Sequence, residues 1–280
     1  MFQQKLSTFL RPQVYRVAKW LDECVGQFEA GFNRPLRRCL LCGSGEAGDQ
    51  ALCTGCFDDL PRVRSPCSIC GGNVGSARLL HPDLTSAVSP ALICGQCIRV
   101  PPVYDKARCG LEYEFPADEL IRSIKYRAAL HWIPPLTCSV SSELDILLDG
   151  CQSEQVRLIP VPLHRSKACH RGFNQAAAIA RALAVPKRLR VEHRLLLRAR
   201  ATRPQAALAP ESRRENMREA FIVDAQRLRE LRSIKALTTL VLIDDVMTTG
   251  ATADECARAL KAVEPSLTVL VFALARKSQC

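Results

Sequence analysis

The segment from Leu240 to Thr252, Leu-Val-Leu-Ile-Asp-Asp-Val-Met-Thr-Thr-Gly-Ala-Thr, constrains the fold more than any other part of the chain. Leu240 to Ile243 form a short apolar run, which predicts a strand that is buried on both faces and ends at two adjacent carboxylates. From Thr252 to Val263 the apolar side chains recur at helical spacing. The segment therefore predicts a buried strand, a polar turn and an amphipathic helix.

The predicted turn has the composition of a phosphate-binding loop. Backbone N–H groups at the start of a helix point outward, and the helix dipole favours an anion there. Asp244 and Asp245 would repel a phosphate, but they can accept hydrogen bonds from a diol or hold a metal ion beside it. A sugar phosphate meets both demands. The residues that supply hydroxyl donors and close backbone approach are Thr248, Thr249, Gly250 and Thr252.

All thirteen positions of this segment resemble the loop that binds 5-phosphoribosyl pyrophosphate (PRPP) in type I phosphoribosyltransferases. Two other interpretations are weaker. A buried strand with a solvated acid pair and an ordinary helix cap does not require the Thr-Thr-Gly-x-Thr pattern. A Walker B strand of an ATPase requires a Gly-Lys-Ser/Thr loop elsewhere, and the chain contains no Gly-Lys pair.

Eight of the fifteen cysteines form four Cys-x-x-Cys pairs in one segment. Two such pairs supply the four thiolates of a tetrahedral zinc site, and a site filled by cysteine has no open position for catalysis. We therefore predict two structural zinc ions. Sequential pairing closes shorter loops and is favoured, while interleaved pairing and an iron–sulfur cluster are the alternatives. The predicted ligands are Cys39, Cys42, Cys53, Cys56, Cys67, Cys70, Cys94 and Cys97.

The basic charge of the chain is concentrated in one stretch. The formal net charge is +11, and residues 151 to 236 contain nineteen Lys or Arg against seven Asp or Glu, a balance of +12 that leaves −1 for the rest. Such a surplus suits a polyanion, either pyrophosphate or a nucleic acid, although a solvated surface explains it equally well. No apolar run approaches the roughly 20 residues of a membrane helix, so we expect a cytoplasmic protein without a membrane span.

The pattern along the 280 residues predicts three regions: an N-terminal helical segment at 1–38, a double zinc ribbon at 39–100 and a larger domain at 101–280. In the last region, strands expected at 107–113, 156–161, 195–197, 220–223, 240–243 and 267–274 alternate with helical segments. The helical segments are 118–127, 132–148 with a proline break, one reaching about 184, and 252–263. This alternation predicts an α/β fold with a mainly parallel sheet flanked by helices. Because ligands bind beyond the C-terminal ends of such strands, the loops at 162–167 and 244–252 are expected to face one crevice.

Residues from about 39 to 280 resemble the ComF family, phosphoribosyltransferase-like proteins linked with natural competence and DNA uptake or use. The motifs that carry the resemblance are the Cys-x-x-Cys pairs, the Pro-Val-Pro-Leu-His-Arg turn ending at Arg165, Arg171-Gly-Phe-Asn-Gln175, Arg203-Pro-Gln205 with Arg213, Asn216 and Phe221, and the PRPP loop. The resemblance implies a type I phosphoribosyltransferase fold preceded by a small zinc-ribbon module with four cysteines at each metal.

The resemblance also implies roles for individual residues. Asp244 and Asp245 would hold the ribose hydroxyls, with Mg²⁺ bridging sugar and pyrophosphate, and Arg203 and Gln205 would belong to a mobile lid. The residues expected at the 5′-phosphate are Met247, Thr248, Thr249, Gly250, Ala251 and Thr252, and those of the pyrophosphate loop are Pro162, Leu163, His164 and Arg165. Arg165, Lys167 and Arg171 would stabilise the departing pyrophosphate. His164 also fits an exposed loop histidine, and Lys167 and Arg171 fit a solvated face.

Two functions follow as expectations. The first is transfer of phosphoribose from PRPP to a base or amine. The second is a non-catalytic zinc-ribbon adaptor that binds single-stranded DNA or the competence machinery, with PRPP as a regulator. The basic stretch argues against strand binding, because Phe173 and Phe221 are its only aromatic residues.

Overall fold

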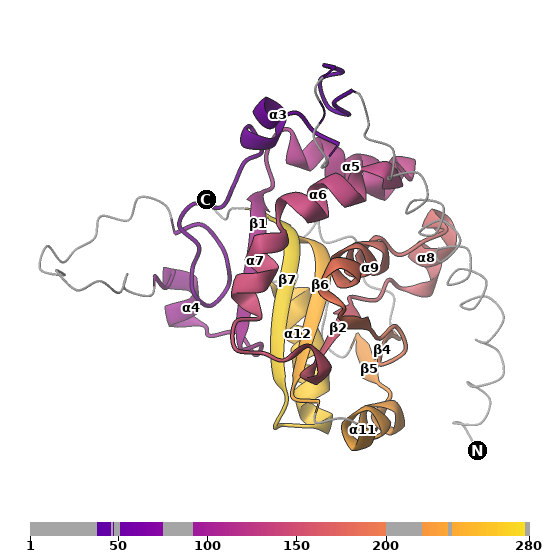
Figure 1. Ribbon diagram of the computed structural model, residues 1–280. Coiled ribbons are helices and arrows are strands. Elements are labelled where there is room, and N and C mark those ends of the chain that lie inside the picture. The colour runs from indigo at the N-terminus through magenta and orange to yellow at the C-terminus, as the bar shows by residue number, and fades with distance from the viewer. Residues whose placement is uncertain are drawn as a thin grey trace, which may run out of the picture.

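Strands and helices alternate along the chain in the computed structural model, which describes residues 38–45, 47, 51–74, 92–199, 220–234 and 237–277 (Figure 1). The expected N-terminal helix lies outside the described residues. So do the expected lid residues Arg203 and Gln205, together with Arg213 and Asn216.

Five parallel strands form the central sheet in the order β1-β7-β6-β2-β3. Their bounds are β1 Lys106–Glu112, β2 Val156–Pro160, β3 Arg190–Val191, β6 Thr239–Met247 and β7 Thr268–Arg276. The predicted α/β fold with a mainly parallel sheet is therefore confirmed. The strand predicted from Leu240 lies beside β7 at its centre, where both faces of the sheet are covered.

Helices cover both faces of this sheet, and two short helices lie among the Cys-x-x-Cys pairs (Figure 1). Their bounds are α3 Thr54–Asp58, α4 Gly95–Arg99, α5 Ala117–Arg127, α6 Ile133–Ser139, α7 Ser141–Leu147, α8 Arg165–Arg171, α9 Gln175–Lys187, α11 Ala225–Ile234 and α12 Ala251–Val263, with short 3₁₀ turns η1 Leu130–Trp132 and η2 Ser153–Gln155. None of the described helices is long and apolar enough to cross a membrane.

Side chains of the central strands alternate between two apolar cores. Leu240 and Leu242 of β6 face a core shared with α11 and α12, whereas Val241 and Ile243 face a core shared with α5, α6, α7 and α9. This alternation follows from the two-residue period of a strand, and both sets are apolar because both faces are buried.

Two details differ from the sequence-based expectation. The segments near 196 and 222 are not part of the parallel sheet, because β4 Leu196–Arg198 and β5 Phe221–Val223 form a separate antiparallel pair. Each has three residues; Leu196 and Phe221 are buried in the core that includes α12, whereas Leu197 and Ile222 are exposed. The helical break near 132–148 lies at Val140, while Pro134 and Pro135 occupy the first turn of α6, where a missing N–H costs little.

Candidate functional site

The acid pair lies inside β6 rather than after its end. Asp244 pairs with Ala273 of β7, and β6 continues to Met247 opposite Arg276. On the other side, β2 pairs with β6 only as far as Ile243. The sequence prediction that the strand ends at the acids is therefore wrong in detail. The pair still lies beyond the end of β2, at the C-terminal edge of the sheet.

A lysine from α5 contacts the second carboxylate of the pair. Lys125 Nζ lies 3.0 Å from Asp245 Oδ1, and both side chains are largely buried. Burial alone would lower the pKa of Lys125, but the adjacent charge of Asp245 outweighs it and the pKa is raised. The other oxygen, Asp245 Oδ2, is buried and has no hydrogen-bond partner among the described residues. One oxygen of Asp245 is therefore held in place and the other remains an available acceptor.

The surroundings of Asp244 raise the pKa of its carboxyl group. Burial, and then the charge of Asp245, raise its pKa to about 7, while Lys125 and Arg198 act in the opposite direction. Its Oδ1 accepts a hydrogen bond of 2.9 Å from the backbone N–H of Asp245. Asp245 forms an ion pair with Lys125, and the charges of Lys125 and Arg198 both favour the ionised form of Asp244.

The turn after β6 has the backbone needed for close approach of a ligand. Gly250 has φ +81° and is the N-cap of α12, so its conformation disfavours other residues. Thr249 Oγ1 accepts a hydrogen bond of 3.3 Å from the N–H of Ala251, and Asp254 N–H donates to the Gly250 carbonyl at 2.8 Å. The sequence-predicted strand, turn and helix are present, with helix α12 starting at Ala251.

The predicted pyrophosphate loop follows the neighbouring strand β2. Residues 162 to 164 form a loop, and Arg165, Lys167 and Arg171 lie on the short helix α8 that begins at Arg165. Asn174 holds this connection: its Nδ2 donates to the Val161 carbonyl at 3.1 Å, and its Oδ1 accepts from Ala176 N–H at the start of α9. Because β2 and β6 are parallel neighbours, their following loops lie at one edge of the sheet.

Arg198 of β4 connects the basic and acidic halves electrostatically. Burial lowers the pKa of Lys167, and Arg198 and then Arg171 lower it further. The same Arg198 favours the charged form of Asp244. Arg198 therefore acts electrostatically on both the basic turn and the acid pair.

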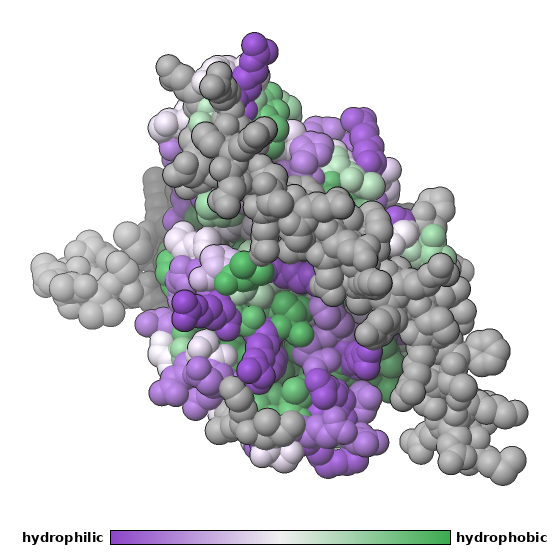
Figure 2. All heavy atoms as spheres, turned by 45° about the vertical axis from the view of Figure 1, so that its right-hand side comes forward, coloured by the Kyte–Doolittle hydropathy of each residue, from purple (hydrophilic) through white to green (hydrophobic). Residues whose placement is uncertain are grey.

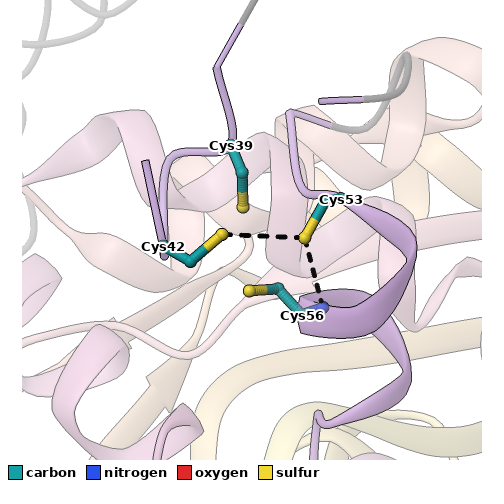
Figure 3. A group of neighbouring side chains, drawn as sticks. All are labelled: Cys39, Cys42, Cys53 and Cys56. Carbon is teal, nitrogen blue, oxygen red and sulfur yellow. Dashed lines mark hydrogen bonds between the residues drawn. The ribbon is translucent and has the colours of Figure 1, made fainter. Parts of the chain in front are cut away.

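The cysteines form two groups of four: Cys39, Cys42, Cys53 and Cys56, and Cys67, Cys70, Cys94 and Cys97. Figure 3 shows the four side chains of the first group pointing toward one another. Within each group all sulfur atoms lie within 4.8 Å of one another, and the Cys42–Cys53 and Cys70–Cys94 Sγ distances are 3.7 Å. A tetrahedral zinc ion with Zn–S bonds of about 2.3 Å requires sulfur separations of about 3.8 Å. Each group can therefore hold a zinc ion, and the grouping is the sequential pairing favoured from the sequence.

Several residues at this edge of the sheet had no role in the sequence analysis. Lys125 was placed on a helix without a function, although its position beside the apolar face of Leu120, Ile121 and Ile124 is an unusual one for lysine. Arg198 and Arg276 end short apolar runs and give no pattern that predicts their partners. Only the fold brings these charges to the acids and the cysteines.

The surface near the basic turn is mixed in character. Where its atoms are coloured, Figure 2 shows hydrophilic and apolar side chains side by side on this face of the molecule. Tyr126 at the end of α5 and Phe115 before its start are 73% and 79% exposed. The guanidinium of Arg171 lies 5.3 Å from the Tyr126 ring centroid, and Arg122 and Arg127 flank the same side of α5. The exposed ring of Tyr126 therefore lies beside the basic helix, and Phe115 is exposed at the other end of α5.

The sequence is similar to several bacterial proteins. It is 28% identical over 213 residues to the DNA utilization protein YhgH of Salmonella typhimurium, covering 75% of this chain and 89% of the relative. It is 28% identical over 218 residues to the protein of that name from Escherichia coli O6:H1, with the same coverage. It is 26% identical over 230 residues to Competence protein F of Haemophilus influenzae, covering 80% of this chain and 90% of the relative. No family model matches the chain.

Proposed function

Because the chain belongs to the ComF family of competence and DNA utilization proteins, we propose that it binds PRPP with Mg²⁺ at the C-terminal edge of its parallel sheet and transfers the phosphoribosyl group to a base or amine. The observation that carries this proposal is the acid pair near the C-terminal end of β6, on the same short segment as the glycine-capped start of α12. Acceptors for a diol and donors for a phosphate are thus adjacent.

Different residues of the chain contact different parts of the proposed substrate. Asp244 and Asp245 accept hydrogen bonds from the ribose hydroxyls, and the turn from Met247 to Thr252 donates to the 5′-phosphate. Lys125 holds Asp245 in place through an ion pair of 3.0 Å. The buried, unpartnered Asp245 Oδ2 fits a site for a hydroxyl or a divalent cation. When bound, Mg²⁺ neutralises charge on the pyrophosphate.

In the proposed reaction, the basic turn after β2 receives the leaving group. In the reaction, the bond between ribose C1 and the pyrophosphate oxygen breaks, and a bond forms between C1 and the acceptor nitrogen. Pyrophosphate leaves with the bonding electrons, and the acceptor's proton passes to solvent. Positive charge on Lys167 and Arg171 of α8 stabilises the negative charge that develops on the leaving group. The predicted lid residues Arg203 and Gln205 would exclude water from this centre.

Calorimetric titration with PRPP and Mg²⁺ tests the binding step. Asp245→Asn removes the charge at nearly constant volume, and we expect the affinity for PRPP to fall by at least about tenfold, because a charge-assisted hydrogen bond is lost. Asp149→Asn is the matched control, since Asp149 is an exposed aspartate of a remote loop. Equal affinities in the two variants would remove the proposed site. PRPP binding without pyrophosphate release across a broad screen of bases and amines would remove the transfer step alone.

A second function, binding of single-stranded DNA, is favoured by the exposed aromatic residues at the two ends of α5, of which Tyr126 lies beside Arg171 of α8. Phe115 and Tyr126 can stack on bases while Arg122, Arg127 and Arg171 contact phosphates. The double variant Phe115→Ala/Tyr126→Ala should weaken binding of a fluorescent oligothymidine by at least about tenfold, because stacking contributes roughly 1–3 kcal/mol per base. Ile146→Ala, on exposed α7, is the control. Absence of strand binding at low salt would exclude this function.

A further inference from the structure

The second four-cysteine cluster, formed by Cys67, Cys70, Cys94 and Cys97, shares an apolar core with the turn that follows β6. Its three buried cysteines belong to the same core as Met247 and Ala251, the residues at the two sides of that turn. The first cluster packs instead into the core on the opposite face of the sheet, with Leu60 and Leu111. The second cluster is therefore the one placed next to the proposed phosphate-binding residues.

The Cys67–Cys70 knuckle lies directly on strand β1. A Cβ added at Gly71, which has φ +65°, would lie 3.0 Å from the Ala107 carbonyl oxygen and 3.0 Å from Arg108 Cα. The N–H of Ala107 donates to the Ile69 carbonyl at 2.7 Å. There is thus no space between knuckle and sheet, and a change in the shape of the knuckle must be transmitted to the sheet edge.

Arg276, the last residue of β7, joins the cluster to the end of β6. Its Nη2 lies 3.8 Å from Cys70 Sγ, and its side chain covers Gly72, where an added Cβ would lie 3.2 Å from Arg276 Nε. Its backbone pairs with Met247, and the next N–H, of Lys277, donates to the Met247 carbonyl at 3.0 Å. Arg276 Nη1 is buried without a hydrogen-bond partner among the described residues. The side chain of Arg276 therefore contacts the sulfur cluster, and its backbone pairs with Met247.

The segment after Cys97 forms a second connection. Tyr104 is 4% exposed, and a Cβ added at Gly250 would lie 3.3 Å from its hydroxyl oxygen. The N–H of Val103 donates to Asp254 Oδ1 at 2.8 Å, in the first turn of α12. The segment that follows the fourth cysteine thus packs against both the glycine of the turn and the helix that starts there.

We propose that metal loading of the second four-cysteine cluster fixes the conformation of the turn at 247–252, with Arg276 and Tyr104 as positioning residues. Four thiolates around a divalent ion carry a net charge of −2, which a buried guanidinium partly neutralises. Without the metal, the thiols have no common centre, and the knuckle under Arg276 and the segment at 103–104 lose their fixed support. That the turn then binds phosphate less well rests on the proposed function.

Hydrogen–deuterium exchange of the full chain tests the connection without any ligand. Cys94→Ser removes one half-buried ligand of the second cluster, and Cys42→Ser removes one ligand of the first; each variant should retain one zinc per chain instead of two. We expect the amides of residues 246–254 to exchange several-fold faster in Cys94→Ser and at the wild-type rate in Cys42→Ser. Unchanged exchange in Cys94→Ser, or equal acceleration in both variants, would overturn the proposal.

Variants of Arg276 provide a second test of the proposal, which applies even if Cys94→Ser does not fold. Arg276→Gln should release zinc from the second cluster about 10- to 100-fold faster to a chelator, as expected when an outer partner of a metal site is lost, and should accelerate exchange at 246–254. Arg276→Lys, which keeps the charge, should restore most of both. Wild-type behaviour of Arg276→Gln in both measurements would contradict the proposed role. If wild-type protein does not bind PRPP, the proposed function fails, while the exchange comparison still decides this inference.

Discussion

The first four-cysteine cluster lies near the surface of the molecule, whereas the second is built into its core. In the first cluster Cys39 is buried, Cys53 and Cys56 are half-buried and Cys42 is exposed; in the second, Cys67, Cys70 and Cys97 are buried and Cys94 is half-buried. The two clusters have the same ligands and the same Cys-x-x-Cys spacing. Their difference shows that the ligand set determines which metal is held, while the packing around the ligands determines how much of the fold depends on it.

Each cluster also has an arginine beside it, and the two arginines contact different partners. Arg62, which follows the first cluster in the chain, donates to the Ser139 carbonyl and lies 4.6 Å from the Phe57 ring centroid. Arg276 contacts a cysteine of the second cluster directly. Arg62 therefore connects the segment after the first cluster to α6. Arg276, by contrast, contacts a sulfur atom of the second cluster.

The largest effect is expected from removing one knuckle of either cluster. We predict that Cys67→Ser/Cys70→Ser lowers the free energy of unfolding by more than about 4 kcal/mol, since metal binding contributes on the order of 10 kcal/mol to folding of small zinc modules. Cys39→Ser/Cys42→Ser should lower the free energy of unfolding by less than about half as much, because the metal-free segment of the first cluster can detach from α6. Urea unfolding followed by circular dichroism measures both. A greater loss in the first-cluster variant would reverse the comparison.

The rate of metal loss should also separate the clusters. With a chromogenic chelator in excess, we expect zinc to leave in two phases of equal amplitude, with the exposed first cluster emptied on the order of 10- to 100-fold faster. Cys42→Ser should abolish the fast phase and leave the slow one. A single phase in the wild-type protein would show that burial of the second cluster does not protect its metal.

Sequence alone was sufficient for the parts of the molecule that depend on local patterns. The alternation of apolar strands with helices predicted the parallel sheet, and the Cys-x-x-Cys spacing predicted which cysteines group together. It was insufficient where a residue's neighbours come from distant segments. Lys125 and Asp245 are 120 positions apart in the numbering, and Arg276 and Cys70 are 206 apart. The extent of β6 was missed for a similar reason, because the partner strand β7, rather than local propensity, extends it through the acids.

A smaller effect is expected at the arginine that attaches the first cluster. Arg62→Met removes the hydrogen bond to the Ser139 carbonyl and the cation–π contact with Phe57, and should lower the free energy of unfolding by about 1–2 kcal/mol. Arg64→Met is the matched control, because Arg64 is exposed two residues away, and it should change stability by less than about 0.5 kcal/mol. Equal urea midpoints for the two variants would show that Arg62 does not attach the cluster.

The smallest effect concerns the acid pair, which shares the C-terminal edge of the sheet with the second cluster. Burial and the charge of Asp245 raise the pKa of Asp244 to about 7. A carboxyl group with a raised pKa is protonated when the pH is below that pKa. The protonated form accepts hydrogen bonds from a diol less well. We therefore expect the proposed binding of a ribose diol to tighten as the pH rises through about 7.

We predict that the affinity for PRPP and Mg²⁺ falls about fourfold from about pH 8 to about pH 6.5, as the ionised fraction of a group with pKa near 7 falls. Calorimetric titration in matched buffers measures this change. Asp244→Asn should give a flatter profile that retains only the titration of the ligand itself. Cys42→Ser should reproduce the wild-type profile, because the first cluster lies in the other core. A shifted profile in Cys42→Ser would show that the first cluster also acts on the acid pair. The proposed difference between the two clusters would then be wrong for this site.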